Sequence, residues 1–570
     1  MITFKKRKCD FMNRTEIKKV LNDLAADINN TADKKVASIL NTLVNLVEIL
    51  VEKNSELEQK NKNLQDEVNR LKGEQGKPNI RKQSKNDNDD TNDTDHSSED
   101  DRKKRQETLA RKPKIKKKKI INIDRQITCE IDKDNLPVDA VFKGYETRII
   151  QDLKIITDNI EFILPTYYSR LLNKTFIAPL PKEYQGEFAP GIRTLVITLY
   201  RDSGMTEPAI ERFFKTFNIW ISKSTLSRMI TENHDQFHQE KEDIISAGLK
   251  ANPYQHLDDT SCRVNGKNQY THILCNPYFT AYFTRPKKDR LTILEILCRN
   301  ELKFTINNNA YELMMELGLS NKRLIELKIM AREGSLTRDE IDNLLMQIFP
   351  NPKKHSTNRR IIREAAAIVY YHASEFAIEH LICDDAPQFN KIAKHKSLCW
   401  IHEGRHYKKL DPIFLLHRIF LNNFIEQFWN YYEMLLIHQK TPSAFAAQEL
   451  SEKFDALFST KTGYEALDDR IVATFAKKEF LLLVLTFPFL LLHNNPAELG
   501  ARVQARMRDI NLQTISENGT KTKDTFATIV QTARKLGVNI YHYVYDRISK
   551  NYSMTSLSDL IVEKSDLLSI

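Results

Sequence analysis

Three short runs with strand character, separated by turn signals, constrain the fold of this chain more than any other feature. The runs cover residues 254–264, 270–275 and 278–284. Asn265-Gly266 separates the first two, and it is the strongest short hairpin signal because both turn positions need a positive φ. Asn276-Pro277 is a weaker turn signal before the third run. The sequence therefore predicts three antiparallel strands, followed by an apolar helix over residues 291–297.

The first run carries the acidic string His-Leu-Asp-Asp-Thr at residues 256–260. Asp258 is expected midway along the strand. Because side chains alternate along a strand, Asp258 shares one face with Thr260 and Cys262, and Asp259 points to the other face. Only one of the two carboxylates can therefore reach a given site.

A second acidic string, Cys-Asp-Asp-Ala-Pro-Gln-Phe, occupies residues 383–389. It follows an apolar run whose last four residues, 380–383, predict a short buried strand. Asp384 would emerge at the C-terminal end of that strand, which is the usual position of a site in open α/β sheets. Asp385 would begin the loop.

A third string, Asn-Asn-Pro-Ala-Glu at residues 494–498, predicts the start of a helix. Asn495 is expected as the N-cap, with Pro496 at the first helical position and Glu498 in the first turn. Arg502 and Arg506 follow at i+4 and i+8, on the same face as Glu498. That face could hold a metal ion and DNA phosphates together.

Each string alone has a simpler interpretation. An Asp-Asp pair is usually a solvated turn, Asn-Asn-Pro before a helix is usually only a cap, and Arg502 can pair with Glu498 across one helical turn. Their joint occurrence, in order and in suitable local structure, favours convergence of Asp258, Asp384 and Glu498. Two Asp and one Glu at one point would bind a pair of hard divalent cations, the known solution for cutting and joining phosphodiesters.

These strings resemble those of the insertion sequence 66 family of transposases. The resemblance runs over about residues 40–550 and includes five parts of the chain: Asp258-Asp259-Thr260, Asp384 with Phe389, the spacing of Cys399, His402 and Arg405, residues 494–498, and residues 532–537. The chain departs from the family pattern at His493, where Asp is common, at Leu499, where Arg is common, and in the loop at 515–519. The family's Cys-rich region has only Cys129 here, so no zinc site is expected.

The resemblance implies a transposase of a bacterial insertion sequence, with catalytic and metal-binding roles for Asp258, Asp384 and Glu498. Two Mg²⁺ (or Mn²⁺) ions would be the cofactors. Its partners would be double-stranded DNA at element ends and target, with room for accessory proteins of the same element. Water would first cut the element end, and the freed 3′-hydroxyl would then attack target DNA. The rival interpretations are an inactive DNA-binding remnant or regulator, and a nuclease without strand transfer.

The family fold implies an α+β or α/β chain with a ribonuclease H-like catalytic domain at residues 251–550. Helical insertions are expected near 300–375 and 411–489, because both stretches are long and rich in Leu, Ile, Glu and Lys. An apolar run at 480–492 would form a buried helix leading to Glu498. Residues 551–570 are expected to be a C-terminal tail.

Upstream, residues 121–250 are expected to form a DNA-binding region. Residues 191–233 have helix-turn-helix spacing, with Gly204 ending the first helix and Ser222 capping the third. Lys223, Ser224, Thr225 and Arg228 would face DNA, and Arg405, Arg502 and Arg506 are further expected DNA contacts. A trihelical core without DNA contact is the alternative. The role of residues 121–185 is not assigned.

The N-terminal segment, residues 15–75, predicts a leucine-zipper coiled coil. Leucine recurs every seven residues, at Leu43, Leu50, Leu57, Leu64 and Leu71. Asn54 and Asn61 occupy the other core position, where Asn fixes register and favours a parallel dimer. The expected assembly is a homodimer or higher oligomer, and the alternative is a long helix packed on its own protein. Residues 76–120, with opposed acidic and basic blocks, predict a flexible charged linker.

Composition agrees with a multidomain DNA enzyme. The 570 residues predict roughly three or four domains, and a net charge of +10 favours a polyanionic partner. The seven Cys form no Cys-x-x-Cys pair, which fits a reducing compartment. The longest apolar run contains Pro488 and is too short to span a bilayer. We therefore expect no membrane partner, no signal peptide, and a location in the bacterial cytoplasm with the nucleoid.

Overall fold

The computed structural model describes residues 42–51, 53, 54, 56, 57, 59–61, 64, 123–129, 140, 143–181, 184, 186–299 and 301–566. The expected linker at 76–120, and the parts of the expected coiled coil at 15–41 and 65–75, lie outside the described residues. In the described parts of the chain, no helix combines the length and apolar character needed to cross a membrane.

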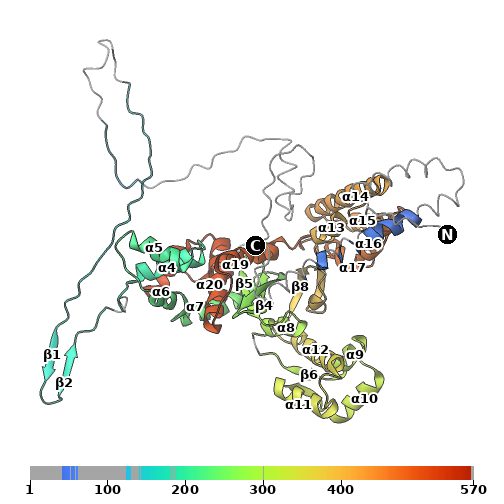
Figure 1. Ribbon diagram of the computed structural model, residues 1–570, viewed down its shortest axis with the longest axis horizontal. Coiled ribbons are helices and arrows are strands. Elements are labelled where there is room, and N and C mark those ends of the chain that lie inside the picture. Colours follow the sequence, from blue (N-terminus) through green and yellow to red (C-terminus); the bar gives the residue numbers. More distant parts are fainter. Residues whose placement is uncertain are drawn as a thin grey trace, which may run out of the picture.

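A mixed five-stranded sheet lies at the centre of the chain (Figure 1). In spatial order its strands are β5 (Thr280–Arg285), β4 (Lys267–Cys275), β3 (Tyr254–Val264), β8 (Ile378–Cys383) and β9 (Ala393–Leu398). β3, β4 and β5 pair antiparallel, and β8 and β9 run parallel to β3. Asn265 and Gly266 have φ values of 47° and 74°, as the two-residue hairpin requires. The three predicted strands are therefore confirmed, as is the helix after them, α8 (Arg290–Leu297).

Helix α20 (Glu517–Leu536) covers the outer edge of β5. Alternate residues of β5 donate their backbone N–H groups to side chains one helical turn apart: Thr280 to Thr532 Oγ1 at 3.3 Å, Tyr282 to Thr528 Oγ1 at 3.1 Å, and Thr284 to Asp524 Oδ2 at 2.5 Å. The spacings match because four helical residues rise about 6 Å and two strand residues about 6.6 Å. The helix thus satisfies an edge that would otherwise be open to another strand.

The main hydrophobic core lies between this sheet and its covering helices. These are α7 (Asp235–Lys250), α8, α12 (Ser356–His372), α20, α21 (Ile540–Ile548) and α22 (Leu557–Asp566). Leu557 and Ile561 of α22 are fully buried, and this helix packs against α7. The expected C-terminal tail is therefore wrong for residues 557–566, because its apolar face completes the core.

A first lobe is inserted between β5 and β8 and lies below the sheet in Figure 1. It comprises β6 (Phe304–Ile306), α9 (Asn308–Glu316), α10 (Asn321–Met330), β7 (Gly334–Leu336), α11 (Arg338–Ile348) and α12. The insertion expected near 300–375 is mainly helical, but β6 and β7 form an antiparallel pair. The prediction missed this pair because three-residue strands are too short to show a period of two.

A second lobe, inserted between β9 and the third acidic string, is entirely helical. It comprises α13 (Trp400–Lys408), α14 (Leu415–Lys440), α15 (Ala444–Phe458), α16 (Glu465–Phe475), α17 (Lys478–Leu481) and α18 (Leu483–Thr486). Its core is built around the fully buried ring of Trp400. The single helix expected over 480–492 is wrong, because Pro488 disfavours helix at Phe487, whose ψ is 81°.

Three short helices form a small body at the other end of the sheet (Figure 1). They are α4 (Pro190–Arg201), α5 (Glu207–Lys215) and α6 (Lys223–Thr231), and they share a core of their own. The predicted signals are confirmed: Gly204 has a φ of 72°, and Ser222 Oγ accepts the Thr225 N–H at 3.1 Å. Upstream of these helices, β1 (Thr166–Ser169) and β2 (Lys174–Ile177) form an isolated hairpin.

The described positions between residues 42 and 64 are helical, and one face of this helix packs on the second lobe. Buried Glu48 accepts the backbone N–H groups of Ile413 and Phe414 at 2.8 and 2.7 Å, and contacts His417 Nδ1 at 2.8 Å. Its charge therefore caps the N-terminus of α14, where the helix dipole favours an anion. The alternative interpretation, a helix packed on its own protein, holds for this face.

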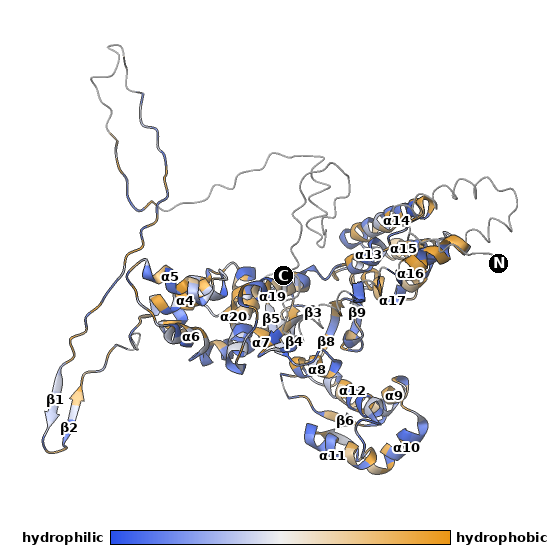
Figure 2. Cartoon of the chain, viewed as in Figure 1, coloured by the Kyte–Doolittle hydropathy of each residue, from blue (hydrophilic) through white to orange (hydrophobic). Residues whose placement is uncertain are grey.

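The described heptad leucines lie on the surface of the same helix. Leu50 and Leu57 are 64% and 56% exposed, and Leu43 and Leu64 are exposed as well. Figure 2 shows the apolar colouring of this helix beside α16. An exposed leucine stripe with a seven-residue repeat is the surface that a coiled-coil partner would cover.

We expect Leu50→Glu with Leu57→Glu to convert the full-length protein to a monomer. Four buried charges per dimer would oppose association, whereas the contacts of Val44 and Glu48 with the second lobe stay intact. Light scattering after size exclusion measures the mass. Val472→Glu, at an exposed apolar position of α16, is the control and should leave the mass unchanged. A wild-type protein that is already monomeric at micromolar concentration would contradict the coiled-coil prediction.

Candidate active site

The sheet brings Asp258 and Asp384 to the same level. β3 and β8 are parallel neighbours, with His256 opposite Ile382. Continuing this register by two residues brings Asp258, midway along β3, level with Asp384, the first residue after β8. The predicted strand end is confirmed, and it places two carboxylates on adjacent strands.

Helix α19 (Asn495–Asn511) adds the third carboxylate, Glu498, in its first turn. The helix packs across β3 and β4. The closest approach is at Gly500, where an added Cβ would lie 2.8 Å from Ile273 Cγ2. Ile273 is the cross-strand partner of Asp258. The close packing of helix on strand therefore sets the distance between Glu498 and the two Asp residues.

The three carboxylates interact electrostatically. Burial, with smaller contributions from the charges of Asp384, Glu498 and Asp259, raises the pKa of Asp258 to about 7, against one hydrogen bond from the Asp259 N–H. Burial also raises the pKa of Asp384, opposed by the Ala386 N–H, which donates to Asp384 Oδ1 at 3.1 Å. Carboxylates that disfavour each other's ionisation form a site that favours a cation.

Helix α13 faces this group with two basic side chains. Arg405 donates to both oxygens of Glu498, at 3.1 and 2.6 Å, a bidentate geometry that fixes the carboxylate plane. One turn earlier, burial lowers the pKa of His402, while the charge of Asp384 raises it. Arg405 is expected from the sequence to contact DNA, but in the structure it forms an ion pair with Glu498. Arg502, the alternative partner, lies one turn further along α19.

Asn494 holds the separate segments together. Its Nδ2 donates to the Leu257 carbonyl at 2.9 Å, and its Oδ1 accepts from His256 Nδ1 at 3.0 Å. Its backbone N–H donates to Cys399 Sγ at 3.2 Å. Burial lowers the pKa of His256 to about 3, so the ring stays neutral in this contact. One buried amide thus joins β3, α19 and the start of α13.

The expected cap of α19 is wrong by one residue. Asn494 is the N-cap, Asn495 the first helical residue and Pro496 the second. The Asn494 side chain makes no capping bond because its amide is used by β3. A local pattern of Asn-Asn-Pro cannot distinguish these two roles.

The neighbouring carboxylates have partners of their own. Asp259 accepts from Gln388 Nε2 at 2.8 Å and lies 3.5 Å from Lys288 Nζ. Asp385 lies 2.7 Å from Lys477 Nζ and 3.8 Å from Lys396 Nζ. Each neighbour is therefore balanced by lysine, whereas Asp258 and Asp384 face other carboxylates.

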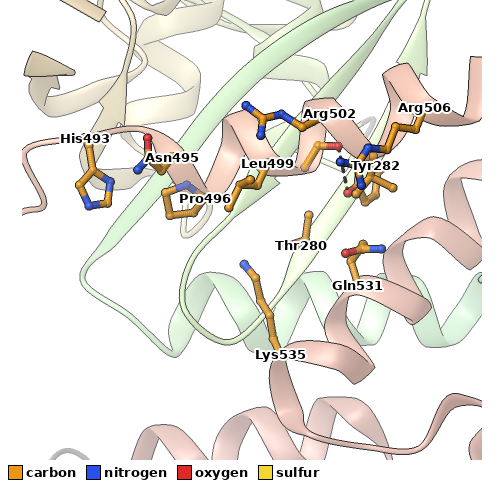
Figure 3. Close-up of a pocket in the computed structure, with 12 residues that line it drawn as sticks. Thr280, Tyr282, His493, Asn495, Pro496, Leu499, Arg502, Arg506, Gln531 and Lys535 are labelled. Atoms are coloured by element: carbon orange, nitrogen blue, oxygen red, sulfur yellow. Dashed lines mark hydrogen bonds between the residues drawn. The ribbon is translucent and has the colours of Figure 1, made fainter. Parts of the chain in front are cut away.

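A basic pocket of about 470 Å³ lies between α19, β5 and α20 (Figure 3). Arg502 and Arg506 line it from α19, together with His493, and Lys535 lines it from α20. Lys535 Nζ donates to the Phe279 carbonyl at 2.8 Å. Glu498 is not among the lining residues. Arg502 and Arg506 therefore line a pocket next to the three carboxylates, and the carboxylates themselves lie outside it.

The other expected DNA contacts lie on α6, in the trihelical body. Lys223, Ser224 and Arg228 are exposed. The polar groups of Thr225 already have partners within the helix. Its backbone N–H and its hydroxyl bond to Ser222 Oγ, and Arg228 donates to Thr225 Oγ1 at 3.3 Å. Three of the four side chains therefore remain accessible to a partner.

Comparison with known proteins adds one similarity. An uncharacterised protein, y4jO, of Sinorhizobium fredii (strain NBRC 101917 / NGR234) is 26% identical over 327 residues, which cover 56% of this chain and all of that protein. No protein-family model matches the chain.

We expect Gly500→Ala to impair any reaction at this site. The new Cβ would meet Ile273 at 2.8 Å and Tyr282 Oη at 3.4 Å, so α19 must shift and carry Glu498 with it. Overpacking of this kind costs about 1–3 kcal/mol. Gly191→Ala is the matched control, since no atom lies within 4 Å of its added Cβ and helix propensity should raise stability by about 0.5–1 kcal/mol. Thermal unfolding of both variants tests this, and equal midpoints would contradict the packing argument.

Proposed function

We propose that this chain is a transposase that cuts DNA strands and joins them at Asp258, Asp384 and Glu498. One observation carries the proposal: the fold brings Asp384 and Glu498, from strings more than a hundred residues apart, close enough to buried Asp258 that their charges add to the effect of burial in raising its pKa. Structural acidic residues are normally neutralised by bases, as Asp259 and Asp385 are here. Glu498 has Arg405 as its partner, but a buried carboxylate such as Asp258, whose pKa is raised by burial and by neighbouring carboxylates, is typical of functional sites.

The sheet supports a ribonuclease H-like core for this activity. Asp258 lies on the middle strand of a mixed sheet, and Asp384 follows the parallel strand beside it. The two helical lobes interrupt the chain between the carboxylates without interrupting the sheet. The arrangement therefore agrees with a catalytic domain that carries helical insertions.

Asp258, Asp384 and Glu498 fit a pair of Mg²⁺ or Mn²⁺ ions as ligands. Carboxylate oxygens are the donors that hard cations prefer, and positive charge would relieve the repulsion that raises the pKa of Asp258. When bound, such ions supply activation of the attacking hydroxyl and stabilisation of the leaving oxygen. Arg405 orients the Glu498 carboxylate, and Asn494 fixes α19 against β3.

Double-stranded DNA is the proposed substrate. Arg502, Arg506 and Lys535 concentrate positive charge beside the carboxylates, and such groups position a phosphate backbone. Lys223 and Arg228 on α6 offer a second contact, in the trihelical body that precedes β3 in the chain. The bacterial cytoplasm, with the nucleoid, is the corresponding location.

A strand-transfer assay tests the proposal. Full-length protein is incubated with Mg²⁺ or Mn²⁺, labelled DNA fragments that flank its coding sequence, and a supercoiled plasmid as target. Labelled plasmid joints are the expected result. Cut fragments without joints would replace the transposase by a nuclease. A shift in gel mobility without cutting would overturn the enzymatic proposal and favour a DNA-binding regulator.

A further inference from the structure

A second group of metal-ligating side chains lies at the opposite end of β8 from Asp384. It consists of Glu379 and His380 on β8 and His395 on β9. One ligand atom from each residue lies within 4.8 Å of the other two. This group shares no residue with the site formed by Asp258, Asp384 and Glu498.

The hydrogen bonding of His380 leaves one of its ring nitrogens available to bind a metal ion. Its ring is 4% exposed, and its Nδ1 lies 3.1 Å from the Pro253 carbonyl oxygen. A carbonyl only accepts, so Nδ1 carries the hydrogen and Nε2 carries the lone pair. Among the described residues, Nε2 has no hydrogen-bond partner although it is fully buried. Histidines that bind metal commonly donate their second N–H to a carbonyl in this way.

The sheet register aligns His395 with His380. The two residues are direct partners in the parallel pair β8–β9, so their side chains share a face. Their rings lie 5.1 Å apart at 23°. Phe487 covers both, with ring centroids 4.5 and 4.9 Å away. An apolar cover of this kind shields metal ligands from water.

Glu379 completes the group: although neighbouring strand residues point to opposite faces, one of its carboxylate oxygens lies within 4.8 Å of a ligand atom of each histidine. It precedes the part of β8 that pairs with β3, which starts at His380. Its carboxylate lies 3.8 Å from Lys394 Nζ in a pair whose side chains are 60% and 70% exposed. Exposed pairs of this kind contribute little, so Lys394 does not hold the carboxylate away from the histidines.

We propose that Glu379, His380 and His395 bind one transition-metal ion, with zinc as the expected occupant. Two imidazoles and one carboxylate are a ligand set that zinc accepts, whereas Mg²⁺ prefers oxygen donors alone. The ion would link the edge strand β9 to its neighbour β8. β9 is followed by α13, which carries His402 and Arg405, and β8 is followed by Asp384.

Zinc titration of the full-length protein tests this inference. The background carries Asp258→Asn, Asp384→Asn and Glu498→Gln, which removes the other carboxylate site. Calorimetry with ZnCl₂ should show one ion per chain, and Co²⁺ should give the visible absorption of a tetrahedral N/O site. Because this readout is binding alone, its result is independent of whether the protein cuts DNA.

Variants of the ligands then locate the ion. His395→Ala and Glu379→Ala should each weaken zinc binding by at least about tenfold. Both residues are at least partly exposed, so the fold should persist, which circular dichroism checks. His542→Ala, an exposed histidine on α21, is the matched control and should bind zinc like the background. Unchanged affinity in both ligand variants, or no zinc binding by the background protein, would overturn the inference.

Discussion

Replacing Asp258, Asp384 or Glu498 by its amide is expected to lower metal-dependent DNA cleavage by at least about a hundredfold. The amides of Asp258→Asn, Asp384→Asn and Glu498→Gln keep the shape of the side chains but remove the charge that would hold the proposed divalent cations. Glu498→Gln also gives up the ion pair with Arg405, so circular dichroism of each variant checks that lost cleavage does not reflect unfolding. Nicking of supercoiled plasmid with Mn²⁺ measures cleavage, and gel mobility measures DNA binding, which should persist.

Asp259→Asn and Asp385→Asn are the matched controls for this series. Each changes a carboxylate one residue away from a proposed ligand, but its partner is lysine rather than another carboxylate. Both variants should retain most cleavage. If Asp385→Asn is inactive and Asp384→Asn is active, the assignment of the second carboxylate is displaced by one residue.

Glu403→Ala is expected to lower the free energy of unfolding of the second lobe by about 3–5 kcal/mol. Glu403, on α13, is 2% exposed. It contacts Arg470, accepts from Thr474 Oγ1 at 2.6 Å and lies 3.2 Å from Lys477 Nζ. Removing the carboxylate leaves Arg470 without its charge partner in a partly buried space, whereas Lys477 keeps Asp385 as a partner. Glu449→Ala removes an exposed pair with Lys453 and should cost only about 0.3–0.5 kcal/mol.

This difference should depend on pH. Burial alone would raise the pKa of Glu403, but the hydrogen bond from Thr474 and the charges of Arg470 and Lys477 outweigh it, so the pKa is lowered. A lowered folded-state pKa contributes stability above the unfolded value of about 4.3 and loses it as pH falls through the folded value. Urea unfolding at pH 7 and below pH 4 should therefore show a large difference from wild type that shrinks in acid. A difference that is constant across this range would contradict the ionised state of Glu403.

Local signals account for the parts of the fold that were predicted correctly. Asn265-Gly266 needs two positive φ values, and the strands on either side have clear β character, so the hairpin follows from a dozen residues. The same holds for the Ser222 cap and for Gly204 at the end of α4. Asp384 could be placed because an apolar run ends directly before it.

Contacts between distant residues account for what was missed. Asn494 looks like a capping residue in its own string, and only the folded sheet brings the Leu257 carbonyl to its amide. The pair between Arg405 and Glu498 joins residues 93 positions apart. Glu48 caps α14 across a separation of 366 residues. No periodicity or spacing rule carries such information, because each partner is common in its local setting.

The hydrogen bond from Asn494 to the Leu257 carbonyl joins two residues that the ribosome adds at different times, so the candidate site can form only late in synthesis. The two residues are 237 positions apart, and ribosomes add roughly 5–20 residues per second. β3 is therefore made at least about 12 s before the amide that pairs with its carbonyl and with His256. During that interval the nascent chain carries Asp258 but not Glu498, so the carboxylates cannot assemble on an unfinished protein. A gene copy truncated before residue 494 would accordingly produce a chain that lacks Glu498 and Asn494, even if it retains the trihelical body.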